Sequence, residues 1–279
     1  HIKKFKPDIV FHLAAQAIVS TSYKYPIKTI ETNVLGTLNL LSVLKEIKKK
    51  CTVVLITSDK CYKNIEVKRG YKENDELGGD DFYSASKASA ELVINSFYKS
   101  YIKDKNNLLK IATARAGNVV GGGDWSENRL IPDCIKCWSR NQKVNVRNPN
   151  ATRPWQHVLE ALSGYLHLAQ KLNSDKKING QSFNFSNNTI KNFTVLKFMM
   201  GIKKYWKTAS WKVTKQTSFH ESTLLQLNST KAKKILNWKN KLRLSETIKL
   251  VGEWYKAYYL TNKKTILTKD QILMYMKKK

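Results

Sequence analysis

The sequence predicts an α/β protein with a doubly wound parallel sheet and a smaller C-terminal lobe. Short apolar runs alternate with longer segments whose apolar residues recur at helical spacing, which is typical of βαβ units. The runs at 8–14, 52–57 and 109–115 are almost continuously apolar, as expected for parallel strands covered on both faces. Beyond residue 127 the elements become shorter. A chain of 279 residues can form one large or two moderate domains.

The other elements follow from their patterns in chain order. A helix is expected over 26–49, with Pro26 in its first turn, and a second long helix over 82–103. Shorter elements are expected as helices at 128–140, 156–172 and 245–259 and as strands at 144–147 and 182–186. We therefore expect a sheet domain over 1–127 and 155–187 and a second lobe over 128–154 and 188–279. A cleft between two lobes is the expected ligand site.

The net charge of +29 comes from 43 lysines and 7 arginines against 21 acidic residues. The lysines are spread through every segment, which indicates solvated helix faces rather than a nucleic-acid surface. No apolar run approaches the roughly 20 residues that span a bilayer, and no signal-peptide pattern is visible. We expect a cytoplasmic protein without nucleic-acid or membrane partners.

Arginine and cysteine positions add two smaller expectations. Several arginines fall close together in the sequence, where their planar fork favours bidentate anion binding. These are Arg115, Arg129, Arg147 and Arg153. Cys134 and Cys137 form a CxxC within a helical pattern without a second pair at zinc-site spacing, so we expect packing residues in a reducing compartment and no metal site.

A polar run, Thr57-Ser58-Asp59-Lys60, stands where the apolar strand at 52–57 ends. Ligands collect beyond the carboxyl ends of strands in open α/β sheets, so these side chains are candidates for chemistry. The alternative is a capped turn, because Ser and Asp are ordinary turn residues.

Tyr83 and Lys87 are spaced to lie on one face of the expected helix at 82–103. A free phenol has a pKa of about 10, and an adjacent cation lowers it by stabilising the phenolate. Such a Tyr can accept a proton from a hydroxyl group while hydride leaves the same carbon. The alternative is a solvated helix face, where this spacing is also common.

Longer segments carry a resemblance to a known family. They read HLAAQAIVSTSY, ETNVLGTLNLL, TSDKCYKN, GYKENDELGGDDFYSASKASAELV, ARAGNVVGGGDW, NPNATRPWQHVLEALSGYLHLA and FHESTLLQLNSTKAKKILNW. The sequence resembles the extended short-chain dehydrogenase/reductases that act on nucleotide sugars, and most closely the CDP-glucose 4,6-dehydratase group. The resemblance implies a Rossmann domain that binds NAD and a lobe that binds a nucleotide sugar, CDP-glucose.

The reaction implied by the resemblance has three steps. The C4 hydroxyl of the hexose is oxidised by NAD, water is eliminated across C5 and C6, and the hydride returns to C6. Tyr83 matches the base at the C4 hydroxyl, assisted by Lys87, and Ser58 matches a residue that hydrogen-bonds the same oxygen. Asp59 matches the general acid at the C6 hydroxyl. Lys60 stands where the dTDP-glucose branch carries Glu, and whether it is the C5 base or only tunes Asp59 stays open.

The resemblance also implies binding residues. Cofactor contacts are implied for Leu13, Ala14, Ala15, Gln16, Asn33, Thr57, Tyr83 and Lys87. Substrate contacts are implied for Asn118, Arg129, Arg147 and Arg153. His157 and His220 are weaker candidates and stay outside the catalytic set, because a lone His is more often structural.

Two departures from the family pattern stand out. The Gly-rich turn that holds a dinucleotide pyrophosphate is not present, and we expect it upstream of His1, with the first βαβ unit missing and weak NAD binding by this chain. Phe82 replaces the Pro that usually precedes the Tyr, which bears on where the helix begins.

Family members commonly dimerise through the helices expected at 26–49 and 82–103, so a homodimer or higher homo-oligomer is expected. The apolar residues considered for this contact are Leu40, Val43, Leu44, Leu92, Val93 and Phe97.

Two other functions stay open. One is a nucleotide-sugar 4-epimerase or a dehydratase for another nucleotide, against which TSDK and RPWQHV argue. The other is a non-catalytic basic binding protein on the same scaffold, against which the joint presence of Ser58, Asp59, Lys60, Tyr83 and Lys87 argues.

Overall fold

The computed structural model describes all residues except 104–107, 188–192, 215–223, 261–263 and 279. The chain divides into two compact units. Unit 1 comprises His1–Gly117, Ser163–Phe185 and Leu227–Trp238, and unit 2 comprises Asn118–Leu162, Ser186–Gln226 and Lys239–Lys279.

These limits differ from the boundaries expected from sequence at residues 118–127, 155–162, 186–187 and 227–238. Leu227–Trp238 belongs to unit 1, because α9 (Thr230–Leu236) packs on strand β7 (Ser182–Phe185) of that unit. Residues 118–127 and 155–162 belong to unit 2, where β4 (Val119–Val120) pairs with β6 (Gln156–His157).

Unit 1 contains a four-stranded parallel sheet in the order β1-β2-β3-β7, and the predicted α/β fold is confirmed. The strands are β1 (Ile9–His12), β2 (Cys51–Ile56), β3 (Leu109–Ala116) and β7 (Ser182–Phe185). The register aligns Ile9 with Thr52 and Thr113 with Ser182. The carboxyl ends of these strands, where parallel sheets place ligand-binding loops, therefore lie at one edge.

The strand predicted over 8–14 is shorter and less buried than expected. It ends at His12, so residues 13–16 form a loop beyond it. Among the described residues β1 pairs only with β2, and Ile9 is 49% exposed. An edge position explains why its apolar run is only partly covered.

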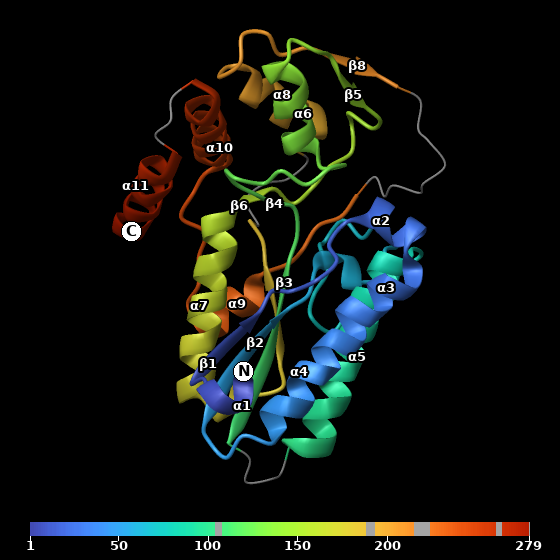
Figure 1. Ribbon diagram of the computed structural model, residues 1–279, viewed down its shortest axis with the longest axis vertical. Helices are drawn as coiled ribbons and strands as arrows, with labels where there is room; N and C mark the ends of the chain where they lie inside the picture. Colours follow the sequence, from blue (N-terminus) through green and yellow to red (C-terminus); the bar gives the residue numbers. More distant parts are fainter. Residues whose placement is uncertain (104–107, 188–192, 215–223, 261–263, 279) are drawn as a thin grey trace. The chain divides into compact units, whose positions relative to one another are not determined.

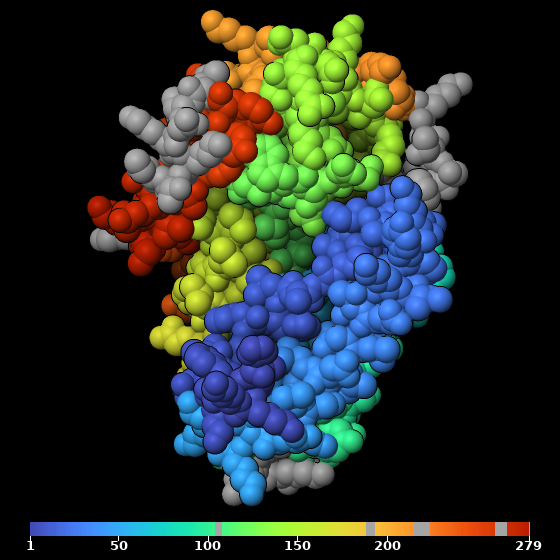
Figure 2. Space-filling view, viewed as in Figure 1, coloured from blue at the N-terminus to red at the C-terminus, as the bar shows by residue number. Residues whose placement is uncertain are grey.

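The helices of unit 1 flank this sheet. Figure 1 shows α4 (Gly36–Lys45) and α5 (Phe82–Tyr101) side by side along one side of the strands, with α9 and the later part of α7 (Val158–Ser174) on the other. Unit 1 also holds α1 (Ile2–Phe5), α2 (Val19–Lys24), α3 (Pro26–Ile30) and two 3₁₀ turns, η2 (Asp59–Cys61) and η3 (Lys176–Ile178). The side chains of residues 1–50, in blue, cover much of this face of unit 1 in Figure 2.

The helix predicted over 26–49 is interrupted. Pro26 starts it as expected, but residues Glu31–Leu35 form a π-helical turn between α3 and α4, and the helix ends at Lys45. Single π-helical turns are frequent at functional sites because they redirect side chains. The turn carries Asn33.

The helix predicted over 82–103 begins at Phe82, as expected, and ends at Tyr101. Asp81 caps it by accepting a hydrogen bond from Ser84 N at 3.0 Å. Its apolar face packs with α4 and the sheet. The buried cluster on this side includes Leu41, Leu44, Val53, Ile94, Phe97 and Ile111.

Unit 2 is built from helices around an aromatic core. Its helices are α6 (Leu130–Ser139), α8 (Val195–Lys203), α10 (Leu244–Leu260), α11 (Lys264–Lys277) and the start of α7, and β5 (Val144–Val146) pairs with β8 (Trp211–Val213). The core contains Trp138, Trp155, Phe198, Trp254 and Tyr255.

Cys134 and Cys137, predicted to be packing residues, lie on α6 of unit 2. Cys134 is fully buried in the core, and burial raises the pKa of its thiol. Cys137 is partly buried, and both thiols are free.

In the described part of the chain, no helix is long and apolar enough to cross a membrane.

Candidate active site

The polar run after β2 forms a buried capped turn. Ser58 N-caps η2, with Lys60 N donating to Ser58 Oγ at 3.2 Å, and Ser58 Oγ donates to Asp59 Oδ1 at 2.9 Å. Ser58 is 6% exposed and Asp59 3% exposed. An ordinary surface turn exposes its polar groups to water, so burial of a hydroxyl and a carboxyl here indicates more than capping.

Tyr83 and Lys87 lie one turn apart on α5, and both are buried, at 8% and 5% exposure. A solvated helix face is therefore excluded. Burial lowers the pKa of Lys87 to about 8, and the negative charge of Glu91 opposes this effect. Among the described residues, the Lys87 ammonium has no hydrogen-bond or salt-bridge partner. A buried cation with open donors is a site for a ligand oxygen.

The two motifs meet within unit 1 because α5 packs directly on η2. Tyr165 of α7 is buried in the same unit, and burial raises the pKa of its phenol, with smaller contributions from the charges of Asp59 and Tyr83. Sequence reasoning missed Tyr165, because it falls in an apolar helical pattern that gives no sign of nearby acids. Its ring packs edge-on against Phe185.

The loop beyond β1 is hydrogen-bonded through Asn33 to helix α5, which carries Tyr83. Gln16 N donates to Asn33 Oδ1 at 2.8 Å, and Asn33 Nδ2 donates to Gln16 O at 3.0 Å and to Ser86 Oγ at 2.8 Å. Ser86 Oγ in turn donates to Tyr83 O at 2.7 Å. The side chain of Asn33, predicted to touch a cofactor, is thus engaged in holding this loop.

The other predicted cofactor residues differ in accessibility. Leu13 and Ala14 are exposed, and Ala15 and Gln16 are partly buried. Thr57 is buried, and its hydroxyl donates to Glu91 Oε1 at 2.6 Å. The loop at 13–16 is therefore the accessible part of this set.

The predicted substrate residues all belong to unit 2. Asn118 has a left-handed backbone (φ 39°), and its carbonyl accepts from Gln156 N at 3.3 Å. Arg129 pairs with Asp124 at 3.1 Å, Arg147 is exposed just beyond β5, and Arg153 Nη1 donates to Thr152 O at 2.9 Å. The partners named here for Asn118, Arg129 and Arg153 also belong to unit 2.

Two further candidates, Arg115 and His157, are both buried. Arg115 does not serve as an open anion site, because it is 3% exposed and bonded to Glu91. His157 is buried, which lowers its pKa to about 4 and keeps it neutral, and its Nδ1 accepts from Leu159 N at 3.3 Å. His220 lies outside the described residues.

A buried Tyr–Lys pair and a buried Ser–Asp pair on a parallel α/β sheet define an enzyme of the dehydrogenase and dehydratase class. The chain belongs to the GDP-mannose 4,6 dehydratase family, whose profile matches residues 1–251. The resemblance expected from sequence is thereby confirmed.

Individual proteins agree with this assignment. The chain is 42% identical over 279 residues to CDP-glucose 4,6-dehydratase of Salmonella typhimurium, covering 99% of this chain and 78% of that one. Its fold matches the epimerase Mth375 of Methanothermobacter thermautotrophicus with a TM-score of 0.81, at 20% identity over 96% of this chain and 76% of that one. It also matches dTDP-glucose 4,6-dehydratase of Bacillus anthracis, solved with NAD, with a TM-score of 0.75 at 20% identity over 91% and 74%.

Proposed function

We propose that this protein catalyses the NAD-dependent 4,6-dehydration of CDP-D-glucose to CDP-4-dehydro-6-deoxy-D-glucose. The observation that carries the proposal is the buried Ser58–Asp59 pair in the unit that also buries Tyr83 and Lys87. Oxidation at one carbon needs a base and a cation, whereas elimination of water needs an additional acid. The 42% identity to a CDP-glucose 4,6-dehydratase supports CDP as the nucleotide.

The residues of unit 1 fit NAD. Lys87 is a buried cation whose ammonium lacks a partner among the described residues, and it would bind the ribose hydroxyls of a dinucleotide. Leu13, Ala14, Ala15 and Gln16 would line the cofactor, and Asn33 would keep their loop in place. When bound, NAD takes the hydride from C4 of the sugar and gives it back at C6.

Oxidation at C4 needs a base for the hydroxyl proton. Tyr83 accepts this proton as phenolate, Lys87 stabilises the negative charge, and Ser58 hydrogen-bonds the same oxygen. The resulting ketone acidifies the proton on C5. In this proposal Lys60 accepts the proton through the lone pair of its neutral amine, and its side chain is half-buried beside Asp59 in the turn.

Elimination needs an acid at C6. Asp59 protonates the departing hydroxyl, which leaves as water while a double bond forms between C5 and C6. Return of hydride to C6 and of a proton to C5 completes the product, so atoms and electrons balance without an external reductant. A 4-epimerase does not use the acid step, and a binding protein would not need a buried Lys87.

The second unit is proposed to bind the nucleotide sugar. Asn118, Arg129, Arg147 and Arg153 supply amide and guanidinium donors suited to a sugar and a pyrophosphate. The charge of +29 is consistent with an anionic small substrate. NAD binding is assigned to unit 1, which contains Lys87 and the loop at 13–16.

We further propose a cytoplasmic homodimer formed through α4 and α5. Leu92 on α5 is 55% exposed and Leu35 beside α4 is 48% exposed, which supports an apolar contact there. Leu44 and Phe97 are buried in the core of unit 1 and cannot contribute. Four free cysteines support a reducing compartment.

Product analysis tests the reaction. The protein is incubated with NAD and CDP-glucose in deuterated water, and the product is examined by mass spectrometry. We expect loss of one water and gain of one solvent deuterium, at C5. A product of unchanged mass would indicate a 4-epimerase and contradict the proposal, and parallel assays with UDP-glucose and dTDP-glucose test the nucleotide.

A further inference from the structure

Unit 1 buries an ion pair that the proposed reaction does not use. Arg115 of β3 donates from Nε to Glu91 Oε1 and from Nη2 to Glu91 Oε2, both at 2.8 Å. Both side chains are 3% exposed. Burying two charges is costly and often contributes little to stability, so such a pair points to a role in fixing geometry.

The pair holds the beginning of the catalytic turn. Thr57 precedes Ser58 directly, and its hydroxyl donates to Glu91 Oε1 at 2.6 Å. Thr57 lies just beyond β2, so this bond ties the first residue after the strand to helix α5.

The same pair holds the end of the turn. Arg115 Nη1 donates to the hydroxyl of Tyr62 at 2.8 Å, and its guanidinium lies 4.9 Å from the centre of that ring. The Tyr62 hydroxyl donates to Asn184 Oδ1 at 2.7 Å. Residues 58–61, which include the proposed acid, are therefore anchored on both sides to one ion pair.

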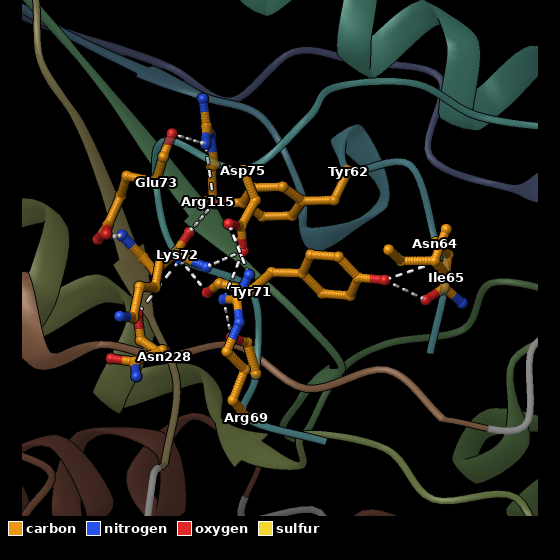
Figure 3. A network of polar contacts seen from close by, with 12 residues as sticks. Tyr62, Asn64, Ile65, Arg69, Tyr71, Lys72, Glu73, Asp75, Arg115 and Asn228 are labelled. Carbon is orange, nitrogen blue, oxygen red and sulfur yellow. Dashed lines mark hydrogen bonds and ion pairs between the residues drawn. The ribbon is translucent and has the colours of Figure 1, made fainter. Parts of the chain in front are cut away.

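The anchor continues into the loop that follows the turn. Figure 3 shows Arg115 between Tyr62 and Glu73, with Nη1 donating to Glu73 O at 3.0 Å. Tyr71 stacks on Tyr62 with ring centres 5.0 Å apart, and Asn228 N donates to Tyr71 O at 2.8 Å. Tyr71 is thus a further packing partner of the Tyr62 ring.

Glu91 also belongs to the helix of the proposed base. It follows Lys87 by one turn and Tyr83 by about two, so all three side chains lie along one side of α5. The position of the Glu91 carboxylate is thereby coupled to the positions of the phenol and the ammonium.

We propose that Glu91 and Arg115 are positioning residues that hold the Ser58–Asp59 turn in register with Tyr83 and Lys87. This role rests on the proposed function for the chemistry of the turn, whereas the hydrogen bonds that hold the turn do not depend on it. The pair acts through Thr57 on one side and Tyr62 on the other.

Hydroxyl deletions test this with a matched control. Thr57→Val and Tyr62→Phe each remove one anchor of the turn and leave the ion pair intact. Thr113→Val removes another buried hydroxyl that donates to the same carboxylate, at 3.1 Å, but belongs to β3 and holds no part of the turn. A simple stability role predicts that Thr57→Val and Thr113→Val behave alike.

Two readouts are measured on each variant. We expect kcat with CDP-glucose to fall by on the order of 10- to 100-fold in Thr57→Val and Tyr62→Phe, with KM changed less than about threefold, because misplaced groups slow chemistry more than binding. Hydrogen exchange of residues 58–63, measured without substrate, should accelerate in these two variants. Thr113→Val should match the unaltered protein in both.

The outcomes are separable. If the unaltered protein lacks dehydratase activity, the proposed function fails, and hydrogen exchange alone decides whether the turn is anchored as described. If the protein is active and Thr57→Val and Tyr62→Phe retain kcat, or if Thr113→Val loses as much as they do, the positioning role is wrong.

Discussion

Lys87 lies one helical turn beyond Tyr83 on α5, and both side chains are almost completely buried. The ammonium has no partner among the described residues, so the folded protein bears the cost of a desolvated charge. Such a cost is typical of active sites, where function and stability compete.

We therefore expect Lys87→Met to stabilise the folded protein while removing activity. Burial lowers the pKa of Lys87 from its ordinary 10.5 to about 8. At about pH 7 the folded state carries the buried charge, so its removal should raise the free energy of unfolding by about 3 kcal/mol. Chemical denaturation without NAD measures the change.

The stability difference between Lys87→Met and the unaltered protein should depend on pH, because the pKa of Lys87 is lowered in the folded state. Between about pH 8 and 10.5 the unfolded chain holds a proton on Lys87 that the folded protein has released, so the stability of the unaltered protein rises with pH in this window. The advantage of Lys87→Met should therefore shrink as the pH approaches 10.5. An advantage that grew with pH would contradict the assigned burial cost.

A packing prediction concerns the glycine run in unit 2. A Cβ on Gly122 would lie 2.0 Å from the Trp254 indole, so Gly122→Ala should destabilise the protein by at least about 2 kcal/mol. Gly36→Ala is the control, because its nearest neighbour would be 3.7 Å away and the residue is helical. The control should be neutral or stabilising by up to about 1 kcal/mol. Thermal unfolding of both variants compares them.

Parts of the fold could be predicted from single segments. The apolar runs located the strands β2, β3 and β7, and the spacing of Tyr83 and Lys87 placed them on one face of a helix. Local patterns suffice where one element carries the information.

Other parts depend on contacts between distant segments. Arg115 was expected to bind a ligand anion, but in the fold it lies beside Glu91 of α5, and the anion it binds is this carboxylate. The π-helical turn at Glu31–Leu35 is invisible to a pattern of apolar spacing, and Leu227–Trp238 joins unit 1 only through contact with β7.

The proposed dimer makes a prediction about the exposed side of α5. Leu92→Glu changes a side chain that is 55% exposed, so the subunit should keep its stability while the protein sediments as a monomer. Phe97→Ala is the contrasting change, since Phe97 is buried and its loss should cost about 3–5 kcal/mol. Persistence of a dimer in Leu92→Glu would exclude this contact.

Asp59 and Tyr83 are assigned different steps of the proposed reaction, and rapid-mixing absorbance with CDP-glucose distinguishes their roles. Asp59→Asn keeps the size of the side chain but cannot donate a proton, so C4 oxidation should proceed and elimination should slow by about 10² to 10⁴. Reduced nicotinamide should then accumulate on the protein. Tyr83→Phe should block the first step and give no such absorbance, although CDP still binds. If Asp59→Asn gives no reduced nicotinamide and loses C4 oxidation as completely as Tyr83→Phe, Asp59 is not the acid of the elimination.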